Sequence, residues 1–440
     1  MIAPRSPLLW LTAFVFIPAA TAFIAIPSFA SFAAIILLVF IFVVSGDALF
    51  LRPSFAPFRV TLPEVVRLSK GREGKIEIRC VNESGHAAEF RLGVLFPGEI
   101  GARENELHLH TDASRESQLF VLSCLPTQRG RFPLRQIFLQ APTKLRLWSF
   151  RHAEPVRSEL RVYPDLLAER RHIAALFLRR GALGIRQHRQ VGKGREFEKL
   201  REYIPGDSAD EVHWKATAKR GRPVTKVFQI ERTQEVYVVI DASRLSARFS
   251  GGTPTLERFI NSALILCLAA ARQNDLFGLI VFSDKVQTFL RAKNGKAHYN
   301  VCRDALYTLQ PHTVTPDFQD VFTFLRLRLR RRALLVFFTA LDDPVLAENF
   351  VDHIGLLTRQ HLVLVNMIQP PDARPLFSAN DVTALDQIYE RLGGHLLWSE
   401  LQGMGQRLHR YGVEFSLLAA EQFAPEGVSR YLRVKQRQLL

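Results

Sequence analysis

The chain has 440 residues, enough for two or three domains that each bury their own core, so a short peptide or a wholly disordered chain is excluded. Apolar residues make up 48% and charged residues 23%, a mixture that predicts folded domains with a membrane segment added. The 58 Lys and Arg residues exceed the 42 Asp and Glu residues by 16, which predicts anionic partners, with phospholipid or an acidic protein ahead of nucleic acid.

The N-terminal segment predicts two membrane spans. Residues 6–46 contain no charged side chain, an interval that suits two spans of about 20 residues each. We expect spans over 8–26 and 29–44, within a transmembrane hairpin formed by residues 1–52. A cleaved signal peptide, the alternative, would have a shorter apolar region followed by small residues. Basic residues flank the two spans, so we expect both flanks to face the cytoplasm.

Residues 53–165 show the alternation of β-strands. Short stretches such as 75–81 and 119–122 alternate in apolar character, and turn residues such as Gly98 and Gly130 separate the stretches. Their spacing predicts an all-β, sandwich-like domain.

The four cysteines lie far apart and form neither a CxxC pair nor a zinc-ligand spacing. Cys80 continues the apolar face of an alternating stretch, and Cys267 lies within an apolar run. We therefore expect buried, unpaired thiols, which favour a reducing compartment.

Residues 166–232 change to a basic and irregular composition, with glycines at 181, 184, 192 and 194. We interpret this segment as a basic linker. A solvated connection explains such charge runs, although its composition also suits a linker with a function of its own.

Apolar runs alternate with helical stretches from residue 233 to residue 440. The runs cover residues 235–241, 276–282, 333–338, 361–368 and 412–418. In the helical stretch 254–274, apolar side chains recur three and four residues apart. This repetition of strand and helix predicts a doubly wound α/β domain around a parallel sheet. Ligands of such sheets lie at the carboxyl ends of the strands.

Oxygen-bearing side chains stand at these predicted strand ends. Asp241 and Ser243 follow the first strand, Thr313 and Thr315 precede a later helix, and Thr339 follows the third strand. Such oxygens suit a hard divalent cation such as Mg²⁺. In the structural alternative, Asp241 caps its loop and Ser243 starts a helix.

This constellation resembles the metal-ion-dependent adhesion site of the von Willebrand factor A domain, which has the pattern Asp-x-Ser-x-Ser and a Thr and an Asp from two later loops. The resemblance implies a Mg²⁺ site at Asp241, Ser243 and Thr315. Leu245 stands at the position of the second Ser, and Ala340 at the position of the later Asp, so two of the five ligands are missing. We expect no cofactor, with Mg²⁺ as the one candidate.

A second resemblance lies upstream. The stretches 194–207, 213–219 and 224–231 resemble, in order and spacing, the signature of the bacterial domain-of-unknown-function-58 (DUF58) family. The matching residues are Arg201, Glu202, Tyr203, Gly206, Asp207, Trp214, Lys215 and Lys226. With the N-terminal hairpin, the β-domain and its Pro-x-x-Arg-Gly motif at 126–130, the resemblance covers nearly the whole chain. His213 departs from it, because the family usually has Asp there.

The signature residues have a structural and an enzymatic interpretation. In the first, Asp207 accepts backbone hydrogen bonds in a tight turn, Trp214 is a large buried anchor, and basic residues pair with acids. In the second, a hydrolase uses Asp207, Asp210, Glu211 and His213 as an acid–base cluster. The sequence has no nucleophile elbow, HExxH helix or phosphate loop, so we expect no catalytic residues.

The DUF58 resemblance implies a function by contact. We expect a membrane-anchored, non-enzymatic adaptor or scaffold, multi-pass in the bacterial inner membrane, that works beside a MoxR-type AAA+ ATPase in the assembly or maturation of envelope proteins. A Mg²⁺-dependent adhesion module is a further alternative. The arginine-rich run 326–332 is either a solvated helix end or a docking site for anionic lipid. We expect no nucleic-acid partner.

Overall fold

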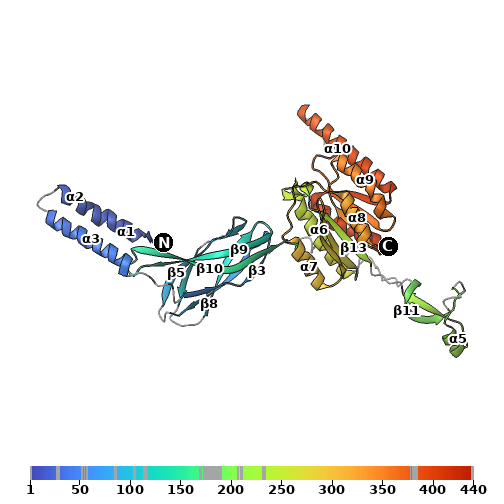
Figure 1. Cartoon of the computed structure of the whole chain (residues 1–440), viewed down its shortest axis with the longest axis horizontal. Coiled ribbons are helices and arrows are strands. Elements are labelled where there is room, and N and C mark those ends of the chain that lie inside the picture. The colour runs from blue at the N-terminus through green and yellow to red at the C-terminus, as the bar shows by residue number, and fades with distance from the viewer. Residues whose placement is uncertain are drawn as a thin grey trace. The chain divides into compact units, whose positions relative to one another are not determined.

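The computed structural model describes residues 2–25, 30–50, 53, 55, 58–83, 87–102, 106–111, 117–167, 171, 191–205, 208, 212–229, 234–376, 378 and 385–437 (Figure 1). The chain forms two compact units, Met1–Asp165 and Leu166–Leu440. The first unit contains the N-terminal helices and a β-domain, and the second contains a small hairpin and an α/β domain.

Two helical segments at the N-terminus are long and apolar enough to cross a membrane. The first consists of α1 (Ser6–Leu11), the π-helical η1 (Thr12–Phe16) and α2 (Ile17–Ala25), and the second is α3 (Ala30–Phe50). Large apolar side chains point outward from both segments, among them Phe14 at 70% and Phe42 at 78% exposure. Such surfaces need apolar surroundings, so the segments fit a membrane. The expected turn at residues 27–28 lies outside the described residues.

The β-domain is a sandwich of two sheets. One sheet has the strand order β1-β10-β9-β5-β7, with β3 also paired to β10, and the other has the order β2-β4-β8-β6. The strands are β1 (Ile2–Pro4), β2 (Phe58–Thr61), β3 (Val65–Ser69), β4 (Gly74–Asn82), β5 (Ala88–Val94), β6 (Ile100–Ala102), β7 (Glu106–Thr111), β8 (Ser117–Pro126), β9 (Gly130–Pro142) and β10 (Trp148–Tyr163). Every other residue of β4 is buried, as the alternation predicts.

The core between the two sheets includes Ile78, Leu92, Ile137 and Leu160, all fully buried. Cys80 and Cys124 lie in the same core, and burial raises the pKa of both thiols to about 11. All four cysteines are buried and unpaired, as expected.

Asp47 fastens the end of α3 to the β-domain. The carboxylate is buried and accepts a hydrogen bond from the Thr143 hydroxyl at 2.5 Å. It also accepts hydrogen bonds from two backbone N–H groups of the β9–β10 turn, at 3.2 and 3.3 Å. Nearby, the indole N–H of Trp148 donates to the backbone oxygen of Val44 at 3.0 Å. These contacts satisfy polar groups that would otherwise be left unpaired at the end of an apolar helix.

The segment interpreted as a basic linker contains regular structure. Strand β11 (Val191–Glu202) pairs antiparallel with β12 (Val224–Gln229), and helix α5 (Trp214–Arg220) lies between them in the sequence. We call these three elements the signature hairpin. Gly221 ends α5 in the left-handed conformation, with φ of 64°, which glycine adopts without steric cost. Residues 172–190 of the expected linker lie outside the described residues.

The α/β domain is built on a six-stranded sheet with the order β17-β16-β13-β18-β19-β20. Its strands are β13 (Glu235–Asp241), β16 (Leu276–Phe282), β17 (Val286–Lys293), β18 (Leu334–Phe338), β19 (Leu362–Ile368) and β20 (Val413–Leu418). The strands β16, β13, β18, β19 and β20 run parallel, and β17 is an antiparallel edge. The first strand of the domain, β13, lies inside the sheet. Strands β16 and β17 follow on one side of it, and β18, β19 and β20 follow on the other.

Helices cover both faces of this sheet. The side chains of α6 (Thr255–Arg272), α7 (Lys296–Leu306) and α11 (Phe423–Gln436) join one core, and those of α8 (Phe318–Arg328), α9 (Pro344–Thr358) and α10 (Leu385–Arg410) join the other. Successive residues of β13 alternate between the two cores, with Val238 in the first and Val239 in the second. The expected fold of two N-terminal membrane helices, a sandwich-like β-domain and a doubly wound α/β domain is therefore confirmed.

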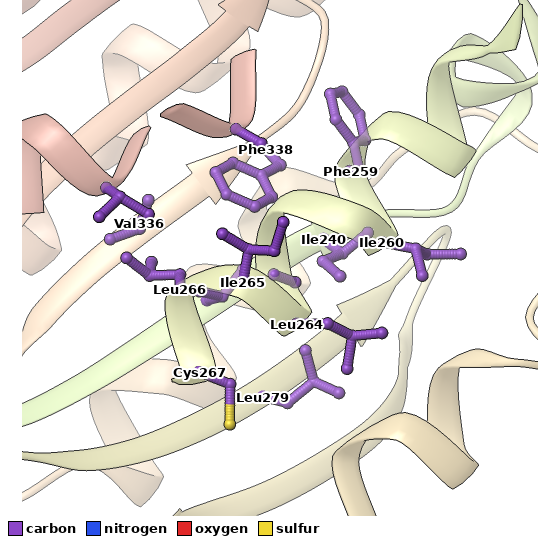
Figure 2. Packing of buried hydrophobic residues seen from close by; sticks show 14 of the residues in the cluster. Ile240, Phe259, Ile260, Leu264, Ile265, Leu266, Cys267, Leu279, Val336 and Phe338 are labelled. Carbon is purple, nitrogen blue, oxygen red and sulfur yellow. The ribbon is translucent and has the colours of Figure 1, made fainter. Parts of the chain in front are cut away.

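The first core lies between α6 and the sheet. Figure 2 shows Leu264, Ile265 and Cys267 of α6 beside Ile240 and Leu279 of the strands. Twelve residues of α6 are buried, which explains why its apolar periodicity is readable in the sequence.

A buried polar network fixes α11 to the rest of the domain. Asp275, immediately before β16, is fully buried, and both the Tyr431 hydroxyl and the Lys435 ammonium donate hydrogen bonds to its Oδ2. Its Oδ1 accepts a hydrogen bond from the backbone N–H of Gln234 at 3.1 Å. Burial and the negative charge of Asp275 raise the pKa of Tyr431, so its hydroxyl keeps the proton that it donates.

Candidate functional site

Asp241 is the last residue of β13 and lies at the carboxyl edge of the sheet, fully buried. Its Oδ1 accepts a hydrogen bond from the backbone N–H of Ser243 at 2.8 Å. Its Oδ2 accepts one from the Thr339 hydroxyl, beyond the end of β18, at 2.7 Å. The carboxylate thus holds two neighbouring loops together.

The loop after Asp241 turns into the short 3-10 helix η4 (Arg244–Ala247), with Ser243 as its N-cap. The Ser243 hydroxyl accepts a hydrogen bond from the backbone N–H of Leu245 at 3.4 Å. Ser246 is buried, and its hydroxyl donates to the backbone oxygen of Ser243 at 2.8 Å. The hydroxyls of this loop are therefore used by the loop itself.

Arg244 connects this loop to two others. Its backbone N–H donates to the carbonyl oxygen of Val314 at 3.0 Å, and its Nε donates to the Thr315 hydroxyl at 3.4 Å. One terminal nitrogen lies 3.9 Å from Oδ2 of Asp343, the N-cap residue of α9. We call Asp241, Ser243, Arg244, Thr315, Thr339 and Asp343 the strand-end site.

The strand-end site does not fit the Mg²⁺ ion that the von Willebrand factor A resemblance implies. The buried side chain of Leu245 carries no oxygen. Both carboxylate oxygens of Asp241 accept hydrogen bonds, one from Ser243 and one from Thr339. Thr315, which is exposed, accepts a hydrogen bond from a guanidinium, and this positive charge opposes a second cation. Asp342, the nearest acid after Ala340, forms an ion pair with Arg248. Mg²⁺ can complete its shell with water, but here an acid is missing and a guanidinium lies beside Thr315, so little negative charge remains to hold the ion.

Replacing Asp241 by asparagine is expected to change how stability depends on pH. Burial raises the pKa of Asp241, and the hydrogen bonds from Ser243 and Thr339 offset part of that rise. A raised carboxyl pKa means that the folded state binds the proton more tightly, so stability falls as pH rises above the unfolded value of about 4. The unfolding free energy of the wild type minus that of Asp241→Asn should therefore decrease from about pH 4 upward, as measured by urea unfolding over a pH series. A difference that increases over this range would contradict the raised pKa.

The signature hairpin has a core of its own. Val212, Val224 and Thr225 are buried, and Val212 forms a bridge with Thr225. The backbone N–H of Val224 donates to the Thr217 hydroxyl of α5 at 3.0 Å. His213 is the N-cap of α5, and its Nδ1 accepts a hydrogen bond from the backbone N–H of Ala216 at 3.1 Å. His213 therefore has a structural task in this arrangement.

The expectation that Trp214 is a buried anchor is wrong. Trp214 is 72% exposed, and Ile204 and Tyr203 are 57% and 38% exposed. The hairpin is too small to cover a large indole in addition to its own few buried residues. Lys215, at the start of α5, is exposed as well. The described part of the signature hairpin thus presents aromatic and basic side chains to its surroundings.

The other signature residues are described in part. Glu202 pairs with Arg222 at 3.4 Å between two largely exposed side chains, and Arg201 donates to the backbone oxygen of Glu202 at 3.4 Å. Lys226 of β12 is half-buried. Gly206, Asp207, Asp210 and Glu211 lie outside the described residues. Among the four residues of the hydrolase alternative, only His213 is therefore described.

The arginine-rich run lies at the end of α8 and before β18. Arg326, Arg328, Arg330, Arg331 and Arg332 are exposed, and Leu327 between them is 70% exposed. Phe324 lies under the guanidinium of Arg328, 5.7 Å from it. This run occupies the amino edge of the sheet, opposite to the strand-end site, because β18 begins there and runs parallel to β13.

Residues 199–382 match the family model described as "Protein of unknown function DUF58", and this range contains much of the signature hairpin together with the strand-end site. The match to the DUF58 family therefore covers part of the second unit of the chain. No curated protein matches the chain. Within the matched range, the strand order of the α/β domain is that of a von Willebrand factor A-like fold.

Several solved structures are similar to part of this chain. The hypothetical protein BatB from Bacteroides thetaiotaomicron is 17% identical with a TM-score of 0.32, covering 46% of this chain and 99% of that chain. An aerotolerance-related membrane protein from Bacteroides fragilis is 17% identical with a TM-score of 0.31, covering 46% and 98%. The von Willebrand factor A domain of SpRpn10 is 12% identical with a TM-score of 0.29, covering 45% and 95%.

Sequence reasoning missed Arg244, which links the three loops of the strand-end site. The family pattern Asp-x-Ser-x-Ser leaves this position unspecified, so the pattern gave no signal for it. The presence of an arginine between two expected ligand positions was the one available sign, because a fixed positive charge disfavours a metal ion beside it.

Proposed function

We propose that this protein is a membrane-anchored, non-enzymatic adaptor that binds a protein partner through its signature hairpin. Its two N-terminal helices span the bacterial inner membrane, and its soluble part lies in the cytoplasm. The partner is a MoxR-type AAA+ ATPase, and the process is the assembly or maturation of envelope proteins.

The exposure of Trp214 is the observation that carries this proposal. Tryptophan, tyrosine and arginine are enriched at the energetic centres of protein interfaces. Trp214 is 72% exposed at the first position of α5, with Ile204 also exposed on the same small unit. A residue so exposed adds little to the folding of the hairpin. Its large apolar surface is therefore available to a partner.

Alanine at Trp214 should weaken the binding of a purified MoxR-type ATPase by at least about tenfold, because truncating a central aromatic residue costs about 2 kcal/mol or more. The full chain in detergent would be titrated with the ATPase and binding followed by interferometry. Phe249→Ala is the matched control, since Phe249 is an equally exposed aromatic residue of the α/β domain, at 71%. Equal binding by the wild type and Trp214→Ala, or no binding by either, would count against the proposal.

The membrane orientation has a separate test. With the soluble part in the cytoplasm, protease added to intact cells should leave residues 58–437 uncut, and cutting should begin once the inner membrane is permeabilised. Digestion in intact cells would overturn the cytoplasmic placement without bearing on the role of Trp214.

Anionic lipid is a second proposed partner. The five exposed arginines of residues 326–332, with the exposed Leu327 among them, combine charge with an apolar side chain that lipid headgroups and acyl chains accept. Each such arginine near a negative membrane contributes about 1 kcal/mol.

A further inference from the structure

The strand-end site contains a fixed positive charge of its own. The guanidinium of Arg244 lies among three loops, those that follow β13, precede α8 and precede α9. These loops meet at the carboxyl edge of the sheet, where ligands of doubly wound domains bind. The charge therefore stands where the fold presents a ligand to the surface.

Arg244 is incompletely engaged by its neighbours. Its side chain is 48% exposed, and its contacts with Thr315 and Asp343 are long, at 3.4 and 3.9 Å. Asp343 offers Arg244 one oxygen only, Oδ2, because its Oδ1 accepts hydrogen bonds from two backbone N–H groups at the start of α9, at 3.0 and 3.4 Å. The guanidinium has five N–H donors in one plane, so donors remain for a further acceptor.

The neighbouring charges orient Arg244 without neutralising it tightly. The loop before α9 contains two acids, Asp342 and Asp343. Asp342 forms a close ion pair with Arg248 and not with Arg244. In the described part of the chain, the acid within ion-pair distance of Arg244 is Asp343, at 3.9 Å, the outer limit of an ion pair. A planar carboxylate can approach to about 2.8 Å and accept two parallel hydrogen bonds, which is a better partner than either present contact.

We propose that Arg244 binds a carboxylate of an acidic peptide segment in a protein partner, and that this site acts without a metal ion. Thr315 and Asp343 position the guanidinium, and Asp241 holds the loop that carries it by accepting hydrogen bonds from Ser243 and Thr339. The inference deepens the proposed adaptor function by adding a second contact surface, distinct from the signature hairpin.

The test uses a fluorescein-labelled peptide of alternating glutamate and glycine and the full chain in detergent at 150 mM salt. Binding, followed by fluorescence anisotropy, is expected to be the same with 5 mM Mg²⁺ and with EDTA. Arg244→Gln should weaken it at least about tenfold, since a bidentate hydrogen bond between charged groups is lost. Arg244→Lys keeps the charge without the planar fork and should weaken it several-fold, which keeps the test decisive if the glutamine variant does not fold.

Arg410→Gln is the matched control, because Arg410 is an exposed arginine at the end of α10, before β20 begins, at the opposite edge of the same sheet. Its binding should equal that of the wild type. Equal weakening by both glutamine variants would show attraction to net charge alone, and loss of binding in EDTA would show a metal site. Either result, or no binding by the wild type, would overturn the inference. Since the peptide replaces the ATPase, failure here is separate from failure of the Trp214 experiment.

Discussion

Replacing Asp275 by alanine is expected to lower the unfolding free energy of the α/β domain by about 3–5 kcal/mol, one of the two largest effects we foresee. The carboxylate is fully buried and accepts hydrogen bonds from Tyr431, Lys435 and the backbone of Gln234. Its removal leaves the Lys435 ammonium, only 17% exposed, without its anion. It also detaches the end of α11 from the turn before β16.

The urea dependence of hydrogen exchange in α6 and α11 would measure this loss. Asp304→Ala is the control, because Asp304 is 49% exposed and pairs only with its neighbour Arg303 in the described contacts. Such an exposed pair contributes less than about 1 kcal/mol. A similar small change for Asp275→Ala would show that the buried network is dispensable.

Replacing Phe350 by alanine should cost about 3–5 kcal/mol of unfolding free energy. The ring is fully buried on α9, with centroids 5.0 Å from Phe318, 5.1 Å from Phe322 and 5.7 Å from Phe337, all edge to face. Alanine removes most of the ring volume from this four-ring cluster and leaves a cavity beneath α8 and α9.

Urea unfolding of the full chain, followed by hydrogen exchange in β18 and α9, would report the effect. Phe350→Leu keeps most of the apolar volume and should cost clearly less than the alanine variant. Phe249→Ala, at an exposed ring, should stay within about 0.5 kcal/mol of the wild type. If Phe350→Ala behaved like Phe249→Ala, the four-ring cluster would not contribute to stability.

The central strands of the α/β domain can be predicted from sequence because burial on both faces makes them continuously apolar. The run 235–241 becomes β13, and all its residues but the first are buried. The edge strand β17 escapes this rule. It is antiparallel, its side chains are half-buried or exposed, and no continuous apolar run marks it.

The signature segment shows a second limit of sequence reasoning. Tryptophan is usually at least partly buried, so its chemistry alone favours an anchor inside the fold. Whether enough chain surrounds Trp214 to cover it depends on the size of the unit, and β11, α5 and β12 are too few. The regular structure of this unit was hidden by its basic and glycine-rich composition.

The strand-end site was predictable in its location but not in its contacts. The position of Asp241 after an apolar run places it at the carboxyl edge of the sheet. The contact between Arg244 and Thr315 joins residues 71 positions apart, and only the packing of their loops brings them together. No spacing within the sequence indicates such a pair.

The buried Asp47 has a mechanical consequence. Asp47 belongs to α3, and its carboxylate accepts hydrogen bonds from the β9–β10 turn. The β-domain is therefore attached to the end of this helix by direct contacts as well as by the connecting chain. A pull or a rotation applied to the sandwich reaches the helix through this joint. A load on the β-domain would then reach a surrounding bilayer directly, as a tilt or a change in depth of the helix.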